Sequence, residues 1–300
     1  MGPWRQTPAW LSRRGWVQLL SAVLANSYYL SGLKGFCYPV LNCWSCPTAN
    51  FACPIGALQN SASSARLALR AGAPMVSVVP LYVIGTLVLF SALFGRLMCG
   101  WLCPFGWFQE LIGLRGKHLR LPQWTSYLRY VVLAGLVFAV PYYTGEAWFS
   151  KLCPMGSLEG SIPQPLLQPH LRSQLGAMWY LKLAILAAVV GAAYVWRRPF
   201  CGVICPLGAI FSMFNRYSAW QIRFAATRCV NCELCVRTCP QGLDPRREVN
   251  SHRCVSCLEC TKCAYGAIRS QPVWRRPVVD QCTTARRPGP DVRKTTEAQE

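Results

Sequence analysis

Four long apolar stretches alternate along the chain with segments that hold most of its cations and cysteines. A bilayer core of about 30 Å needs roughly 20 apolar residues to cross it as a helix, with about 17 as the lower limit. The second and fourth stretches reach this length, the first contains Asn26 and Ser27, and the third is short. The pattern predicts four transmembrane helices, at Trp16–Leu33, Pro74–Phe94, Tyr127–Tyr143 and Ala177–Trp196.

The composition also favours a membrane protein. Of the 300 residues, 53% are hydrophobic and 14% are charged, whereas roughly 25% of a soluble domain is charged. The net charge of +20 would suit a nucleic-acid partner, but its cations gather where the positive-inside rule expects cytoplasmic segments. They lie at the N-terminal end, between the second and third stretches, and after the fourth. We expect a multi-pass protein with both termini in the cytoplasm and no nucleic-acid partner.

Two export signals compete with an uncleaved first helix. The stretch LSRRGWVQL at 11–19 resembles a twin-arginine signal, and Val23-Leu24-Ala25 would suit a signal peptidase. Because three further apolar stretches follow, the sequence favours an uncleaved helix with positive flanks.

The tetrapeptide C-P-x-G, with an apolar third residue, repeats four times at spacings of 50, 50 and 52 residues. Proline is favoured at the first position of a helix, so the cysteine before it should be the N-cap, where backbone N–H groups and the helix dipole stabilise a thiolate. One predicted span separates each motif from the next, so successive motifs should lie on alternate faces. The four cysteines are Cys53, Cys103, Cys153 and Cys205.

The two inner motifs carry a second cysteine. RLMCGWLCPFG supplies Cys99 and Cys103, and RPFCGVICPLG supplies Cys201 and Cys205. Four thiolates on one face are the ligand set of a [4Fe–4S] cluster, although a four-cysteine zinc site uses the same ligands.

The outer face is less regular. One segment holds Cys37, Cys43, Cys46 and Cys53, and Cys153 adds a fifth thiol, with Phe149 where its upstream partner would stand. These thiols suit a metal centre or, in an oxidising compartment, disulfides. The CWSC stretch at 43–46 also resembles a redox C-x-x-C motif.

The C-terminal part carries the most specific pattern, two runs of closely spaced cysteines. Cys229, Cys232, Cys235 and Cys239 follow C-x2-C-x2-C-x3-C-P, which is the bacterial ferredoxin run. A second run supplies Cys254, Cys257, Cys260 and Cys263. This stretch resembles two-cluster bacterial ferredoxins, and the resemblance implies one cluster on Cys229, Cys232, Cys235 and Cys263 and another on Cys254, Cys257, Cys260 and Cys239. The second run ends one residue short and lacks the proline, which leaves the role of Cys263 open.

Other candidate chemistry is sparse. The three histidines, His118, His170 and His252, are poorly placed to bind a haem together. Lys182 lies near the end of its predicted span. There its ammonium group is expected to reach the membrane surface, which is a better explanation of this lysine than a functional role. The sequence has no Gly-rich dinucleotide motif and no nucleophile–base set, and we assign no role to Cys282. The sequence therefore predicts no catalytic residue but a one-electron relay that leaves the chemistry to partners.

From about residue 70 to residue 270 the chain resembles the NapH-type membrane ferredoxins, quinol-dehydrogenase components of the polyferredoxin-like family. The resemblance rests on Cys99, Cys103, Cys201, Cys205 and the eight tandem cysteines. It implies a prokaryotic inner-membrane protein that exchanges electrons with quinone and a protein redox partner. The cofactors would be two [4Fe–4S] clusters, with one or two more at the membrane faces, and a quinone.

The expected architecture is an integral membrane, mainly α-helical domain at 1–218 and a small α+β two-cluster ferredoxin domain in the cytoplasm at 219–272. A disordered basic tail at 273–300 would follow. Two other functions remain open. One is quinone-coupled thiol–disulfide exchange, which explains CWSC but not the tandem runs, and the other is redox assembly or regulation of a respiratory metalloenzyme.

Overall fold

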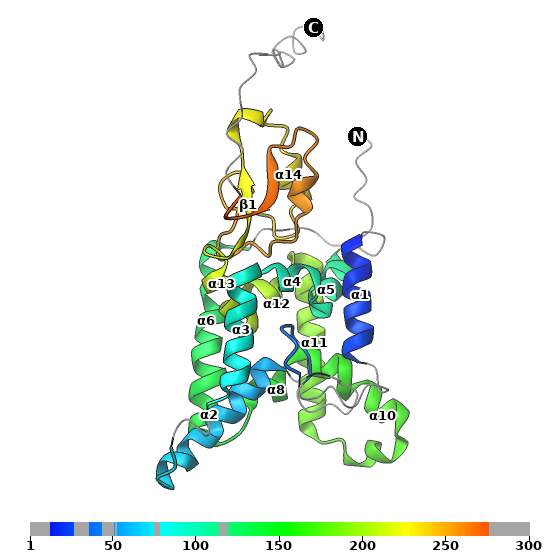
Figure 1. Cartoon of the computed structure of the whole chain (residues 1–300). Coiled ribbons are helices and arrows are strands. Elements are labelled where there is room, and N and C mark those ends of the chain that lie inside the picture. The colour runs from blue at the N-terminus through cyan, green and yellow to red at the C-terminus, as the bar shows by residue number, and fades with distance from the viewer. Residues whose placement is uncertain are drawn as a thin grey trace.

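The computed structural model describes residues 13–26, 36–43, 51, 53–74, 79–113, 119 and 121–275. Cys46, His118, Cys282 and the predicted tail from 276 onwards lie outside the described residues. The described chain is mainly helical, with a two-stranded sheet near its C-terminal end. Figure 1 shows a body of helices with a smaller part, which contains β1 and α14, stacked on one end.

The elements of the helical body follow the chain in this order: α1 (Arg13–Ala25), α2 (Pro54–Arg70), α3 (Leu81–Phe94), α4 (Leu97–Trp101), α5 (Pro104–Gly113), η3 (Gln123–Tyr127), α6 (Leu128–Val132), η4 (Leu133–Ala139), α7 (Val140–Thr144), α8 (Trp148–Leu152), α9 (Pro154–Gly156), η5 (Ser157–Ser161), α10 (Pro163–Leu167), η6 (Pro169–Gln174), α11 (Ala177–Val195), α12 (Pro199–Val203) and α13 (Pro206–Phe214). The smaller part contains β1 (Trp220–Phe224), η7 (Ala226–Arg228), α14 (Leu234–Thr238), η8 (Glu259–Lys262) and β2 (Ile268–Pro272).

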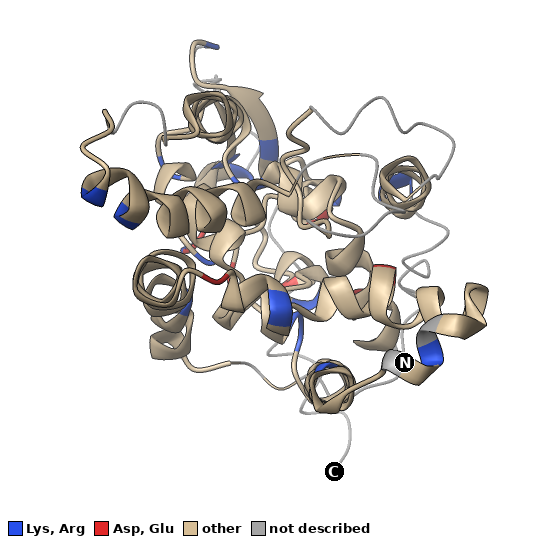
Figure 2. Ribbon diagram, turned by 90° about the horizontal axis from the view of Figure 1, so that it is seen from below, with Lys and Arg blue, Asp and Glu red and all other residues tan. Residues whose placement is uncertain are grey.

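Two helical segments are long and apolar enough to cross a membrane. They are Gln123–Thr144, made of η3, α6, η4 and α7, and α11, with mean hydropathies of 1.3 and 1.8. Only 22% and 17% of their most apolar windows are buried inside the molecule, whereas the core helix of a soluble protein would be largely buried. Figure 2 shows that most of the helical ribbon carries neither basic nor acidic residues.

In the other two predicted spans, the described helices are shorter than the spans. Helix α3 has 14 residues and α1 has 13, against the roughly 20 that a full crossing requires. The first predicted span continues to Leu33, but residues 27–35 lie outside the described part of the chain. The structure thus gives two candidate crossings, and four spans stay a prediction.

The C-P-x-G motifs start helices, as the sequence predicts. Proline stands at the first position of α2, α9 and α13, and α5 also begins at a proline. Cys53, Cys153 and Cys205 precede these helices with nearly the same extended backbone, with φ between −72° and −63°. Because proline needs no N–H at that position, each motif sets a helix start and fixes the cysteine directly before it.

The motif helices lie at opposite ends of the body. Figure 1 places α4, α5, α12 and α13 at the end next to the small part, and α2 and α8 toward the far end. Within the body, α13 packs against α3 and α6, and α5 packs against α1 and α11. In the small part, β1 pairs antiparallel with β2, with Ile222 opposite Ser270. This pairing joins the beginning and the end of the cysteine-rich segment around a core of Ile222, Cys260 and Ile268.

Candidate metal centres

The structure brings the four inner cysteines together. Cys99 lies in α4 and Cys201 in α12, while Cys103 and Cys205 stand directly before α5 and α13. All four are buried. Burial, together with the neighbouring charges of Cys201 and Cys99, raises the pKa of Cys103 to about 12. We call these four residues the inner quartet.

Two arginines cross between the halves of the inner quartet. Arg96 stands three residues before Cys99 and donates from Nη2 to the carbonyl oxygen of Cys201 at 3.2 Å. Arg198 stands three residues before Cys201 and donates from Nη1 to the carbonyl oxygen of Cys99 at 3.3 Å. The two halves, which share the pattern R-x-x-C-G-x-x-C-P-x-G, are therefore related by an approximate two-fold exchange.

The glycine that ends each inner motif makes room for the opposite arginine. A Cβ atom at Gly106 would lie 3.3 Å from Cζ of Arg198, and one at Gly208 would lie 3.3 Å from Nη2 of Arg96. Such contacts are tighter than a side chain normally makes. In the two inner motifs, the last position of C-P-x-G is therefore one where a side chain would meet the guanidinium that packs over it.

The inner quartet lies in a strongly positive environment. Arg96, Arg129 and Arg198 are almost completely buried, and Arg198 pairs with Glu110 at 2.9 Å. Among the described residues, Arg96 and Arg129 form no ion pair, and Nε of each has no hydrogen-bond partner. Buried charge is costly unless it is compensated. Thiolates that bind an anionic iron–sulfur cluster would provide this compensation, so the residues present fit such a group.

Hydrogen bonds also reach the sulfur atoms. Gln109 donates from Nε2 to Sγ of Cys201 at 3.0 Å, and the N–H of Gly208 donates to Sγ of Cys205 at 3.4 Å. The side-chain oxygen of Gln109 accepts from the N–H of Phe200 at 3.1 Å, which holds the amide in this orientation. Hydrogen bonds to cluster sulfur are one of the levers that set a reduction potential.

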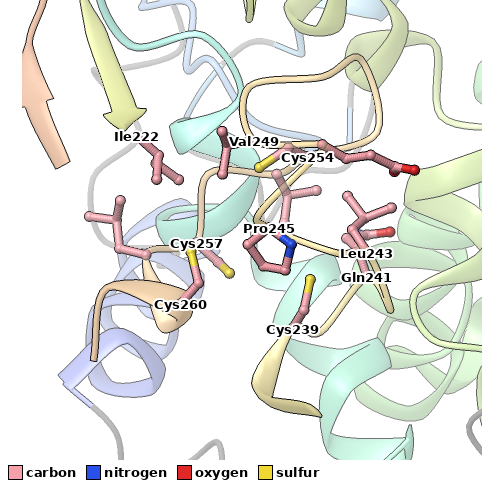
Figure 3. Close-up of a pocket in the computed structure, with 12 residues that line it drawn as sticks. Ile222, Cys239, Gln241, Leu243, Pro245, Val249, Cys254, Cys257 and Cys260 are labelled. Carbon is pink, nitrogen blue, oxygen red and sulfur yellow. The ribbon is translucent and has the colours of Figure 1, made fainter. Parts of the chain in front are cut away.

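A second set of four cysteines lines a cavity of about 380 Å³, partly open to solvent, in the small part. Figure 3 shows Cys239, Cys254, Cys257 and Cys260 around it, with Ile222, Leu243 and Val249 among the apolar lining residues. Burial raises the pKa of Cys257 to about 12, with Arg14 opposing and Cys239 and Cys254 adding to the effect. This is the set that the ferredoxin resemblance assigns to one cluster, and we call it the proximal set.

The remaining tandem cysteines are Cys229, Cys232, Cys235 and Cys263, and we call them the distal set. Fewer interactions among these thiols are seen in the structure than among those of the proximal set. Cys235 lies close enough to Cys229 for that thiol to raise its pKa, although burial has the larger effect. Helix α14, which contains Cys235, packs against η8, which ends directly before Cys263. Cys232 is exposed.

The two tandem runs share an unusual backbone. The residues on either side of the middle cysteine have positive φ in both runs, 54° and 56° for Asn231 and Glu233 and 49° and 62° for Ser256 and Leu258. Left-handed backbone is costly for residues other than glycine. Alternating right- and left-handed residues turn successive N–H groups inward to form an anion-binding concavity, a feature of many iron–sulfur sites.

The missing residue of the second run is absorbed by a tighter helix. In the first run the α-helix α14 leads to Cys239, and in the second the 3₁₀-helix η8 leads to Cys263. A 3₁₀-helix needs fewer residues per turn. Cys239 (φ −65°, ψ 117°) and Cys263 (φ −58°, ψ 120°) therefore end in the same backbone conformation.

The small part docks on the inner face through its backbone. Asn215 donates to the carbonyl oxygens of Ser251 and Cys254 at 2.8 and 3.1 Å. Arg96 and Arg129 both donate to the carbonyl oxygen of His252, at 2.8 and 2.7 Å. Arg14 of α1 pairs with both Glu110 of α5 and Glu259 of η8, which joins the two parts at another point.

The segment of the inner quartet approaches the segment of the proximal set closely at Gly100. A Cβ atom there would lie 2.6 Å from the carbonyl oxygen of Val255 and 3.1 Å from Cα of Cys257. The equivalent residue of the other half, Gly202, has no neighbour closer than 3.9 Å. Only the absence of a side chain at Gly100 lets the residue beside Cys99 contact the residue that carries a proximal thiol.

At the far end of the body, Cys37, Cys53 and Cys153 are buried and Cys43 is half-buried. Among the described residues, no three cysteine, histidine or acidic side chains converge closely enough to share a single metal ion. A four-iron cluster binds each thiolate through a different iron, which spaces its ligands more widely than one ion does.

The arginines and the glutamine around the inner quartet were not predicted. The arginines carried a readable signal, because Arg96 and Arg198 stand at the same place in RLMCGWLCPFG and RPFCGVICPLG. Gln109 and Glu110 have no such signal. Of the histidines, His252 accepts or donates at Nε2 with Ser126 at 3.1 Å and stacks on Tyr127. Lys182 is half-buried, and its carbonyl oxygen accepts from Ser157 at 3.4 Å.

A family model described as a 4Fe–4S binding domain matches residues 77–122, 128–161 and 178–224. These ranges contain the inner quartet and Cys153. The tandem runs lie outside them. The match therefore covers three of the four C-P-x-G motifs and ends before the tandem runs.

Several known proteins are similar to the chain. The uncharacterized protein MJ0750 of Methanocaldococcus jannaschii is 30% identical over 188 residues, 58% of this chain and 71% of that protein. The putative electron transport protein YccM of Escherichia coli is 24% identical over 63% of this chain and 54% of YccM. The methylamine utilization ferredoxin-type protein MauN of Methylorubrum extorquens is 32% identical over 49% of this chain and 48% of MauN. The chain thus spans about half of the last two, and no solved structure matches it.

Proposed function

Because this chain belongs to the family of MJ0750 and contains a 4Fe–4S binding domain, we propose that it is a membrane-bound iron–sulfur electron-transfer protein. It relays electrons between the quinone pool, or a membrane or periplasmic partner, and its ferredoxin-type domain in the cytoplasm. The observation that carries the proposal is the contact of Gly100 with Val255 and Cys257, which brings the inner quartet against the proximal set.

The proposed ligands follow the three sets of cysteines. The inner quartet, the proximal set and the distal set would each hold one [4Fe–4S] cluster, which supplies one-electron transfer when bound. The chain's own residues place the sites in a row. Cys99 is next to the Gly100 contact, Cys257 is on its other side, and Cys235 and Cys260 belong to one apolar core in the small part.

The buried arginines raise the reduction potential of the proposed inner cluster. Arg198 lies close enough to both Cys201 and Cys257 for each thiolate to stabilise its charge. A fixed cation beside a cluster favours the reduced, more negative state. Through its charge, Arg198 therefore raises the reduction potential both at the inner quartet and at the proximal set.

The membrane arrangement is part of the proposal. The long exposed apolar helices Gln123–Thr144 and α11 support a multi-pass protein. With four spans and both termini in the cytoplasm of a prokaryote, the inner quartet would lie at the cytoplasmic surface, within reach of lipid-dissolved quinone. The domain boundaries 1–218, 219–272 and 273–300 and the narrower NapH-type assignment remain predictions.

The test uses the full chain, purified anaerobically in detergent. Cys201→Ala and Cys260→Ala should each lower the iron content by about four atoms per chain, one four-iron cluster, and each should remove a different EPR signal of the reduced protein. Cys282→Ala is the control and should change neither. A reduced quinone analogue should then bleach the visible absorbance of the wild type, and much less that of Cys201→Ala.

Three outcomes would overturn the proposal. Absence of iron from the wild type would remove the relay and favour thiol–disulfide exchange. Unchanged iron in Cys201→Ala would remove the inner quartet from it. Full iron without reduction by either a quinol or a protein donor would favour a regulatory role, in which the clusters sense redox state.

A further inference from the structure

The far end of the helical body gathers a fourth set of thiols that the proposed relay does not use. Cys53 precedes α2 and Cys153 precedes α9, and both belong to C-P-x-G motifs. Burial raises the pKa of Cys153, and Cys53 lies close enough for its charge to add to this effect. Figure 1 places α2 and α8, which border these residues, away from the small part.

Two further cysteines join this pair from the segment 36–43. Burial raises the pKa of Cys37 to about 12, and the charge of Cys53 adds to it. Sγ of Cys43 lies 3.6 Å from the Cβ position of Gly156, the glycine that ends the Cys153 motif. Four thiols therefore surround the far-end motifs, and we call Cys37, Cys43, Cys53 and Cys153 the outer quartet.

The outer quartet reproduces the plan of the inner one. Each consists of two cysteines that precede C-P-x-G helices and two cysteines from elsewhere. Cys53 and Cys153 share the extended backbone of Cys205. All four thiols are buried or half-buried. The same donor set on the same helix starts indicates the same kind of group.

The charge around the outer quartet differs from that of the inner one. Where a guanidinium packs on Gly106 and Gly208, Cys43 packs on Gly156. Glu159 is buried here, accepts from the N–H of Cys43 at 2.6 Å, and its charge reaches Cys53 and Cys153. It lies in η5, a π-helical turn, and such turns are often found at functional sites.

We propose that Cys37, Cys43, Cys53 and Cys153 bind a further four-iron cluster at the face opposite the ferredoxin-type part, with a lower reduction potential than the inner cluster. A nearby carboxylate disfavours the added negative charge of the reduced state, whereas the buried arginines favour it at the inner site. The binding claim is independent of the relay, because it concerns iron at a site that the relay does not require.

The test is again iron content and EPR of the anaerobic full chain. Cys53→Ala/Cys153→Ala should lose about four irons and one signal, which in a redox titration is reduced at a lower potential than the signal removed by Cys201→Ala. Cys43→Ala should weaken the same signal, and Cys46→Ala should leave it unchanged. The signals lost in Cys201→Ala and Cys260→Ala should persist in all of these variants.

A second variant keeps every ligand. Glu159→Gln should retain iron and raise the potential of the outer signal. Glu146→Gln is its control, because Glu146 is an exposed outer acid paired with Lys151 at 2.7 Å. Unchanged iron in Cys53→Ala/Cys153→Ala, a disulfide among these cysteines by mass spectrometry of alkylated protein, or loss of the signal with Cys46→Ala instead of Cys43→Ala would overturn the proposal. These results would leave the inner and ferredoxin-type clusters intact, so they are distinguishable from a failed relay.

Discussion

Arg96 and Arg198 each donate a hydrogen bond to the carbonyl of the cysteine that lies three residues after the other arginine. The exchange links two segments about a hundred positions apart in the sequence and encloses four thiols between two cations. Because the two arginines occupy equivalent positions, the effects of substituting each one can be compared directly.

The first prediction concerns the potential of the inner cluster. Arg96→Gln and Arg198→Gln should each make it more negative, because each removes a buried positive charge that favours the reduced state. Potentiometric titration of the signal lost in Cys201→Ala measures the shift. Arg70→Gln is the control, since Arg70 is exposed at the far end of α2. An unchanged potential in both inner variants would contradict the electrostatic role.

The second prediction separates the two arginines by stability. Arg198 pairs with Glu110, and removing one partner of a buried ion pair costs about 3–5 kcal/mol. Arg198→Gln should therefore lower the temperature at which the visible absorbance is lost more than Arg96→Gln does. Glu110 keeps Arg14 as a partner in the Arg198→Gln variant. Equal temperatures of absorbance loss in Arg198→Gln and Arg96→Gln would mean that Arg14 alone is enough to hold Glu110.

The third prediction tests the contact between the helical body and the small part, which contains the ferredoxin-type cysteine runs. Gly100→Ala would place a methyl group 2.6 Å from the carbonyl oxygen of Val255, so the loop with Cys257 must move away. We expect full iron content but slower reduction of the ferredoxin-type clusters by quinol, measured by rapid mixing and freeze-quench EPR. Gly202→Ala meets nothing closer than 3.9 Å and should be neutral. Equal rates in the two variants would argue against this route.

The fourth prediction uses the left-handed residues of the tandem runs. Glu233 is exposed and has φ of 56°, a conformation that costs a non-glycine residue roughly 1–2 kcal/mol. Glu233→Gly should stabilise the distal cluster against urea by up to about that amount, whereas Glu233→Val should destabilise it. The midpoint of absorbance loss in urea is the measurement, and a gain from valine would show that the backbone strain is not real.

The fifth prediction concerns removal of iron. In the metal-free fold, burial raises the pKa of Cys103 from 9.0 to about 12. Above pH 9 the unfolded thiol loses its proton while the folded one keeps it, so the free energy of unfolding falls as pH rises toward about 12. The iron-loaded protein should lack this dependence, because its thiolates are already deprotonated. Denaturant titrations of both forms across this pH range would show the difference.

The sequence predicted the elements that depend on local chemistry. The C-P-x-G helix starts follow from proline geometry. Among the described residues, the third and fourth predicted spans became the two candidate crossings, although the third is the shortest of the four apolar stretches. The proximity of Cys99 to Cys201 also followed, from alternation of the repeat across a membrane. In the first and second predicted spans the described helices are shorter than the apolar stretches, whereas in the third the helical segment is longer, because an apolar stretch does not fix where a helix begins and ends.

The sequence did not predict which residues far apart in the chain form hydrogen bonds with one another. Nothing in a single chain indicates that Gln109 reaches Sγ of Cys201 or that Glu159 reaches the N–H of Cys43. The shortened second cysteine run suggested a doubtful Cys263, but a change of helix type restores the backbone of that residue. Sequence spacing counts residues, whereas the position of a ligand depends on the rise per residue of the helix before it.

The unequal contacts of Gly100 and Gly202 give the inner site an orientation. Its two halves carry equivalent cysteines, arginines and glycines. By themselves they would therefore give two equivalent routes for electron transfer from the inner site. The small part lies nearer to the first half: a Cβ atom at Gly100 would lie 2.6 Å from Val255, whereas one at Gly202 would lie 3.9 Å from Gln241. In the proposed relay, the placement of one neighbour thus makes the two halves of a nearly symmetric site unequal, without any change in its own ligands.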